Sequence, residues 1–224
     1  MRGLTAVPGQ MTLADGVRLR VRPIVPADRG PLADAFARLS DQSRHRRFLA
    51  PKPRLTTREL EYLTDVDHVT HEALVAIDET TGHIVGVGRY ATGHVGGPVA
   101  DMALAVADAW QRRGIGHALA VRLVERARAN AITTLTGSTL SDNLGARTLL
   151  DRLGFRMCSA SGGVLELELD VARATPPRGQ ATAARAGSRA ARRASAGRAW
   201  RRRASDDPRP CAWSRTAPER SRDS

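Results

Sequence analysis

The feature that most constrains the fold is an apolar run, Val99–Val106, which is followed by a glycine-bearing loop and then by a helical pattern. The run is apolar at nearly every position, which is typical of a strand buried on both faces, so we expect it at the centre of a sheet. The loop, Gln111–His117, reads QRRGIGH. Beyond it, residues 114–130 have helical periodicity, with one apolar face made of Ala120, Leu123, Val124 and Ala127.

This loop has the chemistry of an anion site. Gly114 and Gly116 let the backbone approach a bound group closely. The first N–H groups of the following helix lack partners within the helix, and together with the helix dipole they favour negative charge. Arg112 and Arg113 add positive charge nearby. The glycines alone are equally consistent with an ordinary tight turn. Walker A and GxGxxG patterns are absent, since no Gly-Lys-Ser/Thr follows and position 119 is Leu.

The remaining hydrophobic pattern predicts one mixed α/β (α+β) domain. Residues with period-two alternation or compact β-branched runs predict strands, and those with i, i+3, i+4 spacing predict helices. The expected elements, in chain order, are strand 17–22, helix 32–39, a basic helical segment at 43–47, helix 56–63, strands 73–77, 84–90 and 99–106, helix 114–130, strand 133–140, a helix from Ser141 to Gly154, and strand 165–169.

The order of these elements indicates a mostly antiparallel sheet of six to seven strands, flanked by about four helices, with one parallel crossover. We expect Ser141 to cap the last helix and Gly154 to end it.

Charge is distributed unevenly along the chain. The formal net charge is +12, yet residues 172–224 alone hold 14 Arg and 4 acidic residues. We therefore divide the chain into a flexible N-terminus (1–14), a folded domain (15–171) and a disordered Arg/Ala-rich tail (172–224), because the tail lacks the apolar periodicity that a core needs. The tail either has no function or binds nucleic acid through phosphate contacts.

Other classes of protein find little support in the sequence. Cys158 and Cys211 fit neither a metal nor a disulfide pattern, and no signal peptide or membrane-spanning run is visible. We expect a cytoplasmic protein without a bound metal, acting as a monomer or homodimer.

Two motifs give the chain a specific resemblance. Gln111-x-x-Gly114-x-Gly116 after an apolar strand resembles the Q/R-x-x-G-x-G/A motif of the GNAT superfamily of N-acetyltransferases. Downstream, Asn143-x-x-Ala146-x-x-Leu149-Leu150-x-x-x-Gly154-Phe155 resembles that superfamily's N-x-x-A-x-x-L-Y-x-x-x-G-F helix. The resemblance covers residues 17–169. Within the superfamily, residues 40–48 and 67–76 resemble bacterial protein-lysine acetyltransferases.

The resemblance implies acetyl-CoA as co-substrate and direct transfer of its acetyl group to an amine. The backbone of Leu104, Ala105 and Val106 would pair with the pantetheine arm, and the Val106 N–H would polarise the thioester carbonyl. Asn143 would bond the pantetheine or a structural water. The pyrophosphate would be held by Gln111, Arg112, Arg113, Gly114, Ile115, Gly116 and His117.

Transfer to an amine also requires a base, because a lysine amine with a pKa near 10.4 is almost entirely ammonium at neutral pH. Asp101 interrupts the central apolar run and occupies the position where the family's lysine acetyltransferases usually carry a catalytic Glu, so it is the candidate base. Glu72 is the reserve candidate. Leu150 replaces the Tyr that the family uses to protonate the thiolate, which removes a Tyr acid at that position.

The function that follows is an N-acetyltransferase acting on an amine, either a protein lysine or a small molecule. One alternative is a non-catalytic CoA-binding module, which is supported by Leu150 and by Asp in place of Glu at position 101. Another is a nucleic-acid-associated protein that acts through the Arg-rich tail. Three arginines, Arg44, Arg46 and Arg47, form either a solvated helix face or a contact for an acidic substrate.

Overall fold

The computed structural model describes residues 9–93 and 97–174. Its strands and 3₁₀ turns are β1 (Gly9–Thr12), β2 (Arg18–Pro23), η1 (Pro26–Asp28), β3 (His71–Asp78), β4 (Ile84–Thr92), β5 (Val99–Val106), η2 (Asp108–Trp110), β6 (Thr134–Leu140), β7 (Arg156–Ser161) and β8 (Val164–Asp170). Its helices are α1 (Arg29–Ala37), α2 (Asp41–Phe48), α3 (Thr57–Thr64), α4 (Ile115–Ala129) and α5 (Leu144–Leu153). The predicted tail, 172–224, lies outside the described residues from 175 onward.

One mixed sheet organises the described residues, with the strand order β1-β2-β3-β4-β5-β6-β8-β7. Every neighbouring pair is antiparallel except β5 and β6, which are parallel. The mixed α/β class, the central place of Val99–Val106 and the single parallel crossover are therefore confirmed. The sheet has eight strands, one more than the upper number predicted, and five helices accompany it.

Two strands, β1 and β7, lie outside the predicted ranges, and β1 falls inside the segment expected to be a flexible N-terminus. It forms a hairpin with β2, in which Met11 lies opposite Leu19. The turn is closed by Leu13 N–H donating to the Val17 carbonyl at 2.8 Å, and Gly16 takes the left-handed conformation (φ 84°). The ordered sheet thus reaches back to Gly9, because Asp15-Gly16 is a hairpin turn signal that the strand pattern alone did not include.

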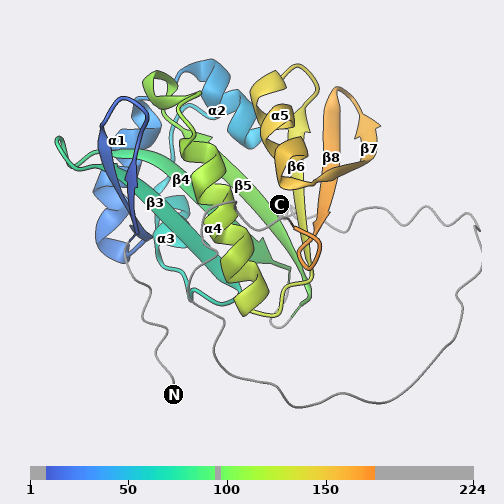
Figure 1. Cartoon of the computed structure of the whole chain (residues 1–224). Helices are drawn as coiled ribbons and strands as arrows, with labels where there is room; N and C mark the ends of the chain where they lie inside the picture. Colours follow the sequence, from blue (N-terminus) through green and yellow to red (C-terminus); the bar gives the residue numbers. More distant parts are fainter. Residues whose placement is uncertain (1–8, 94–96, 175–224) are drawn as a thin grey trace, which may run out of the picture. The chain divides into compact units, whose positions relative to one another are not determined.

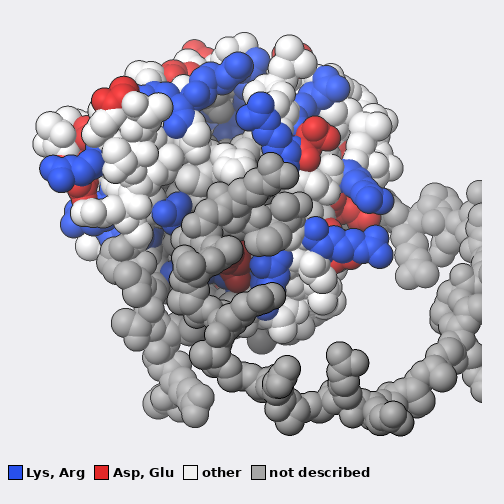
Figure 2. Space-filling model, in the orientation of Figure 1, with Lys and Arg blue, Asp and Glu red and all other residues white. Residues whose placement is uncertain are grey.

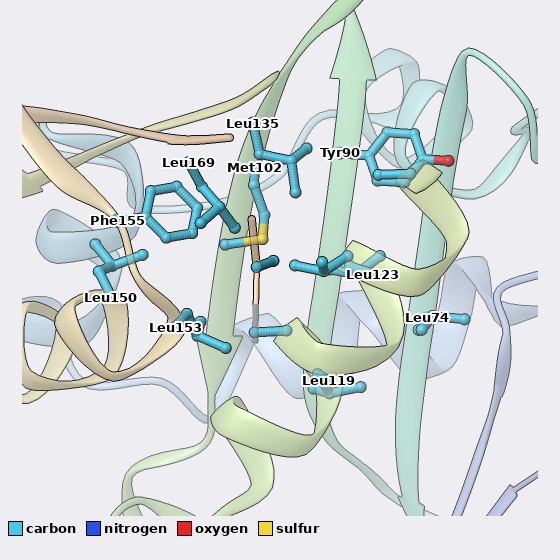
Figure 3. Close-up of a cluster of buried hydrophobic side chains, with 14 of the residues drawn as sticks. Leu74, Tyr90, Met102, Leu119, Leu123, Leu135, Leu150, Leu153, Phe155 and Leu169 are labelled. Atoms are coloured by element: carbon cyan, nitrogen blue, oxygen red, sulfur yellow. The ribbon is translucent and has the colours of Figure 1, made fainter. Parts of the chain in front are cut away.

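Two hydrophobic clusters lie on opposite faces of the sheet. Helices α1 and α3 cover one face, where the buried residues are Ile24, Leu32, Ala73, Val75, Ile77 and Ile84. Helix α4 covers the other face and crosses β3, β4 and β5 (Figure 1). In Figure 3, Leu123 of α4 points toward Met102 of β5, while Leu150 and Leu153 of α5 lie on the other side of Met102 with Phe155.

Helix α4 lies unusually close to β4, and a glycine makes this possible. A Cβ added at Gly88 would lie 2.8 Å from Leu104 Cδ2 and 2.9 Å from Leu123 Cδ1. A larger residue there would require the Leu104 and Leu123 side chains to shift. At Gly86 the same added Cβ would lie 3.0 Å from Ile115 Cγ2, so the start of α4, where the predicted anion loop ends, also packs closely on β4.

The ends of the last helix are partly as predicted. Gly154 ends α5 in the left-handed conformation (φ 92°), which confirms that expectation. The predicted cap at Ser141 is wrong, because Asn143 caps the helix: its Oδ1 accepts a bond from Ala146 N at 3.2 Å. Ser141 and Asp142 instead form a turn, so α5 begins at Leu144.

Candidate active site

The site begins where two central strands separate. β5 and β6 are paired only at Val99–Asp101 with Thr134–Thr136, and beyond Asp101 they diverge. Residues 102–106 and 137–139 then line opposite sides of a cavity of about 380 Å³. The cavity is in the range that holds a cofactor-sized ligand.

The backbone of β5 is oriented toward this opening. Ala107 N–H donates to the Val85 carbonyl at 2.9 Å, so these two residues form a hydrogen-bonded pair between β4 and β5. Such pairs alternate along antiparallel strands, so the polar groups of Ala105 point to β4, while those of Leu104 and Val106 point toward the cavity. Leu104 and Val106 thus present an open strand edge, while the backbone polar groups of Ala105, which also lines the cavity, point toward β4.

The start of α4 closes one end of the cavity. Gly114 is the N-cap residue and has φ 87°, a conformation that glycine adopts without strain. The first intrahelical bond runs from Ala118 N–H to the Gly114 carbonyl at 3.0 Å, which leaves the amides of Ile115, Gly116 and His117 at the free helix end. Gly114 and the three residues that follow it, Ile115, Gly116 and His117, line the cavity. An anion there meets both N–H donors and the positive end of the helix dipole.

A hydrogen-bond network ties this loop to helix α2. Asp108 accepts bonds from Ser40 N (2.9 Å), Ser40 Oγ (2.8 Å) and Ser43 Oγ (2.7 Å). Gln111 Nε2 donates to Ser43 Oγ and to the Val106 carbonyl, both at 3.1 Å. Although burial opposes it, this set of donors holds the pKa of Asp108 below its ordinary value. Gln111 therefore shapes the loop here as well as lining the cavity.

Most of the predicted cofactor residues are gathered at the cavity, and one is not. The residues that line it are Leu104, Ala105, Val106, Gln111, Arg112, Gly114, Ile115, Gly116, His117 and Asn143. Arg113 is absent from its lining: its guanidinium forms an ion pair with Asp15 and lies over the Trp110 ring at 4.6 Å. The pKa of Asp15 is lowered by the backbone bond from Val17 and by Arg113. Arg113 thus fixes the outer side of the loop.

Asp101 stands at the vertex where the strands separate. Its Oδ1 accepts one long bond from Thr136 Oγ1 at 3.4 Å, and it is half-buried. Burial raises the pKa of this carboxyl, whereas Arg47 on α2 and the Thr136 hydroxyl act in the opposite direction. Asp101 is not itself among the residues that line the cavity, but it directly precedes Met102, the first lining residue of β5. A carboxylate with spare acceptor capacity is suited to taking up a proton.

The structure does not bring Glu72, the reserve base, to the cavity. Glu72 is fully buried and is not among the lining residues. Its carboxylate accepts bonds from Arg126 Nη1 (2.6 Å), His68 Nδ1 (2.8 Å) and Ala73 N (2.9 Å). With its acceptor capacity used in this way, Glu72 links β3 to α4.

Leu150 lines the cavity from α5 and is 7% exposed. Its side chain belongs to the cluster shown in Figure 3, together with Phe155 and Leu153. An apolar residue at this place supplies a contact surface but no proton. The proton needed by a leaving thiolate has to come from solvent or another group.

Several site residues were not singled out as cofactor ligands from the sequence. Arg46, Arg47, Thr139 and Arg152 line the cavity, and two of their atoms, Arg46 Nε and Thr139 Oγ1, are buried without a hydrogen-bond partner among the described residues. Buried polar atoms of this kind are normally satisfied by a ligand or water. The cation-rich upper rim in Figure 2 lies over the region where Figure 1 places α2, the start of α4 and α5.

The open β5 edge, the free amides of α4 and these unsatisfied donors fit a thioester cofactor that has amides in its arm and phosphates at its end. Among residues 9–93 and 97–174, no group of three His, Cys, Asp or Glu side chains is arranged to hold a metal ion. No helix in the described part of the chain is long and apolar enough to cross a membrane.

Comparison with known proteins places the same segments in one family. Residues 38–155 match the acetyltransferase (GNAT) family. The acetyltransferase Pat of Mycolicibacterium smegmatis is 29% identical over 168 residues, which are 75% of this chain and 50% of the relative. The chain therefore spans about half the length of that protein. An acetyltransferase of Pseudomonas aeruginosa is 31% identical over 146 residues, covering 64% of this chain and 78% of the relative.

A solved structure agrees with these relatives. The GNAT domain of S. lividans PAT superimposes with a TM-score of 0.68 and 29% identity, covering 73% of this chain and 96% of that domain. The strands that separate, the loop before α4 and the helix after β6 all fall within the matched region.

Proposed function

The chain belongs to the GNAT acetyltransferase family and is an acyltransferase that uses acyl-CoA; on that premise we propose that it transfers the acetyl group of acetyl-CoA to the side-chain amine of a protein lysine. The attack is direct, within a ternary complex. The observation that carries the proposal is the separation of β5 from β6, with free amides at one end and Asp101 at its vertex. The resemblance of residues 40–48 and 67–76 to bacterial protein-lysine acetyltransferases supports a protein lysine as acceptor.

In this proposal the cofactor supplies an activated thioester, and the chain positions it. The pantetheine arm would lie along the open edge of β5, where the polar groups of Leu104 would pair with its amides. The Val106 carbonyl already accepts a bond from Gln111, which leaves the Val106 N–H for the thioester. The amides of Gly114–His117 hold the pyrophosphate at the start of α4, with Arg112 beside them. Asn143 lines the cavity at the start of α5, where its side chain also caps the helix.

Asp101 is proposed as the group that removes the amine proton. The acceptor ammonium loses a proton to this carboxylate, directly or through one water, and the neutral amine attacks the thioester carbonyl. The Val106 N–H, which points into the cavity, stabilises the charge that develops on the carbonyl oxygen. The C–S bond then breaks, and the nitrogen releases its second proton to solvent to give the neutral amide. The CoA thiolate takes its proton from solvent, because Leu150 cannot donate one.

The test is an acetylation assay with the full chain. Acetyl-CoA is incubated with lysine peptides, lysate proteins and small amines, while free thiol release and acetylated lysine are measured separately. We expect thiol release that depends on a protein or peptide acceptor and matches the acetylated lysine formed. Acetylation of small amines alone would reject the lysine acceptor.

Leu150 favours one second candidate, a CoA-binding module without turnover, since the family's thiolate acid is missing there. Calorimetric binding of CoA together with no thiol release on the same panel would support this module over the enzyme. The Arg-rich tail, on which the alternative of nucleic-acid binding rests, lies outside the described residues from 175 onward.

A further inference from the structure

Helix α2 carries three arginines, and one of them is committed to the fold. Arg44 donates from Nε to the Leu39 carbonyl (3.0 Å), from Nη1 to the Pro53 carbonyl (3.2 Å) and from Nη2 to the Ala37 carbonyl (3.3 Å). Its guanidinium also lies 5.4 Å from the centroid of the Phe36 ring. Arg44 therefore holds the turns on both sides of α2, with three of its five N–H donors bound to backbone carbonyls.

Arg46 and Arg47 differ from Arg44 although they belong to the same helix. Both line the cavity, and among the described residues neither donates a hydrogen bond nor forms an ion pair within 4 Å. Arg46 Nε is buried without a partner, and Arg47 contacts the Phe48 ring at 4.9 Å. A buried guanidinium without an anion is costly, so these two side chains are arranged for a group that arrives with a ligand.

The position of Arg47 indicates that this ligand is the acceptor substrate and not the pyrophosphate of the cofactor. Arg47 lines the main cavity and also a second, apolar cavity of about 60 Å³ beneath α1, α2 and α3, which Arg89 borders as well. Its charge acts on Asp101 at the vertex and on Arg89. The pyrophosphate loop is at the opposite end of α2, where Ser40 and Ser43 bind Asp108. Arg47 thus lies near the thioester end, and Arg46 lines the same cavity one helical turn from Ser43.

The charge of this region is not balanced by the chain itself. The described residues that line the main cavity include four arginines and no Asp or Glu. Cations beside the incoming amine repel its ammonium form, which lowers the amine pKa but weakens binding. Carboxylates on either side of the acceptor lysine would pair with the guanidiniums and remove that penalty.

We propose that Arg46 and Arg47 select acceptor lysines flanked by Asp or Glu. The proposal rests on the proposed lysine acetyltransferase function and names the substrate class of the same site. A lysine in a basic segment brings a like charge against both guanidiniums and is disfavoured. The arginines bind and position the acceptor; they exchange no proton with it.

The experiment uses three peptides that share one lysine and differ only in its neighbours, which are Asp, Asn or Arg. With the full chain and saturating acetyl-CoA, we expect kcat/KM for the Asp peptide to exceed that for the Asn peptide about tenfold, and that for the Arg peptide to be lowest. The preference should shrink as salt is raised. Arg46→Gln and Arg47→Gln should reduce the preference, whereas Arg20→Gln, an exposed arginine on β2, should leave it intact.

Two results overturn the proposal: equal kcat/KM for the three peptides, or variants in which KM for acetyl-CoA rises while the peptide preference stays the same. The second result would indicate that the two arginines bind acetyl-CoA and not the peptide. Peptide binding is measured in parallel by fluorescence anisotropy with CoA bound. If no peptide is acetylated, the proposed function fails, yet tighter and arginine-dependent binding of the Asp peptide would still support acidic selection, and equal binding would reject it.

Discussion

Two regions of this molecule bury a carboxylate on the central sheet with an arginine nearby, and they differ in how far each carboxylate is satisfied. Glu72 accepts three bonds, of 2.6, 2.8 and 2.9 Å, from Arg126, His68 and its neighbour's amide. Asp101 accepts one bond of 3.4 Å, and Arg47 forms no ion pair with it within 4 Å. The comparison indicates that a saturated carboxylate stabilises the fold, whereas an unsaturated one at a cavity is available for chemistry.

The largest effect is expected for Asp101→Asn, which tests whether the unsaturated carboxylate acts in catalysis. If Asp101 removes the amine proton, turnover should fall about a hundred- to ten-thousand-fold near neutral pH, because a positioned base contributes that much. CoA affinity, measured by calorimetry, should change little. Rates that equal the native rates at every pH would remove Asp101 as the base.

Glu72→Ala tests the other half of the comparison. Removing this carboxylate leaves Arg126 and His68 without their buried partner, which should lower the free energy of unfolding by about 3–5 kcal/mol. Chemical denaturation measures the loss, and turnover per folded molecule should be kept. Glu79→Ala is the matched control, since its pair with the exposed Arg18 (3.8 Å) contributes at most about 1 kcal/mol. An effect on turnover without a loss of stability would restore Glu72 as a catalytic candidate.

Asp108 is an intermediate case, because it is saturated like Glu72 yet lies beside the cavity. Asp108→Asn weakens the bonds to Ser40 and Ser43 and loosens α2 from the loop. We expect KM for acetyl-CoA to rise about three- to tenfold, the equivalent of roughly 1 kcal/mol, with a smaller change in kcat. Asp142→Asn, at an exposed position before α5, is the control. An unchanged KM would show that the network stabilises α2 alone.

The smallest expected effect is on the pH dependence of stability. The folded pKa of Asp101 lies above its unfolded value of 3.8, so this group favours folding less once pH rises through the folded pKa and the carboxylate forms. Asp101→Asn should therefore be slightly more stable than the native protein at neutral pH, and the gain should vanish below about pH 3.8. Denaturation across pH measures it. A variant that is less stable at neutral pH would mean that Arg47 outweighs burial.

Local signals in the sequence were sufficient for the central strand, the glycine loop and the helix behind it. Val99–Val106 and Gly114–His117 act through backbone and periodicity, which neighbouring residues determine. Side-chain partners were not readable in this way. Arg113 was expected at the pyrophosphate, but it pairs with Asp15, which is 98 residues away in the chain.

The same limit applies to Glu72, whose partner Arg126 lies 54 residues further along, and to Asn143, whose local role as a helix cap was assigned to Ser141. The hairpin at Asp15-Gly16 did have a local signal, yet β1 has only four residues and weak alternation. Which carboxylate is saturated depends on contacts between distant segments, and these exist only once the chain is folded.

The brief pairing of β5 with β6 has a mechanical consequence. The sheet behaves as two leaves, β1–β5 and β6–β8, joined over three residue pairs from Val99 with Thr134 to Asp101 with Thr136. Asp101 lies at this hinge, so any rotation of the leaves that widens the opening also moves the carboxylate relative to the cavity. A ligand that contacts both β5 and β6 would connect the two parts of the sheet. Hydrogen exchange of the β6 amides should then slow when the opening is filled.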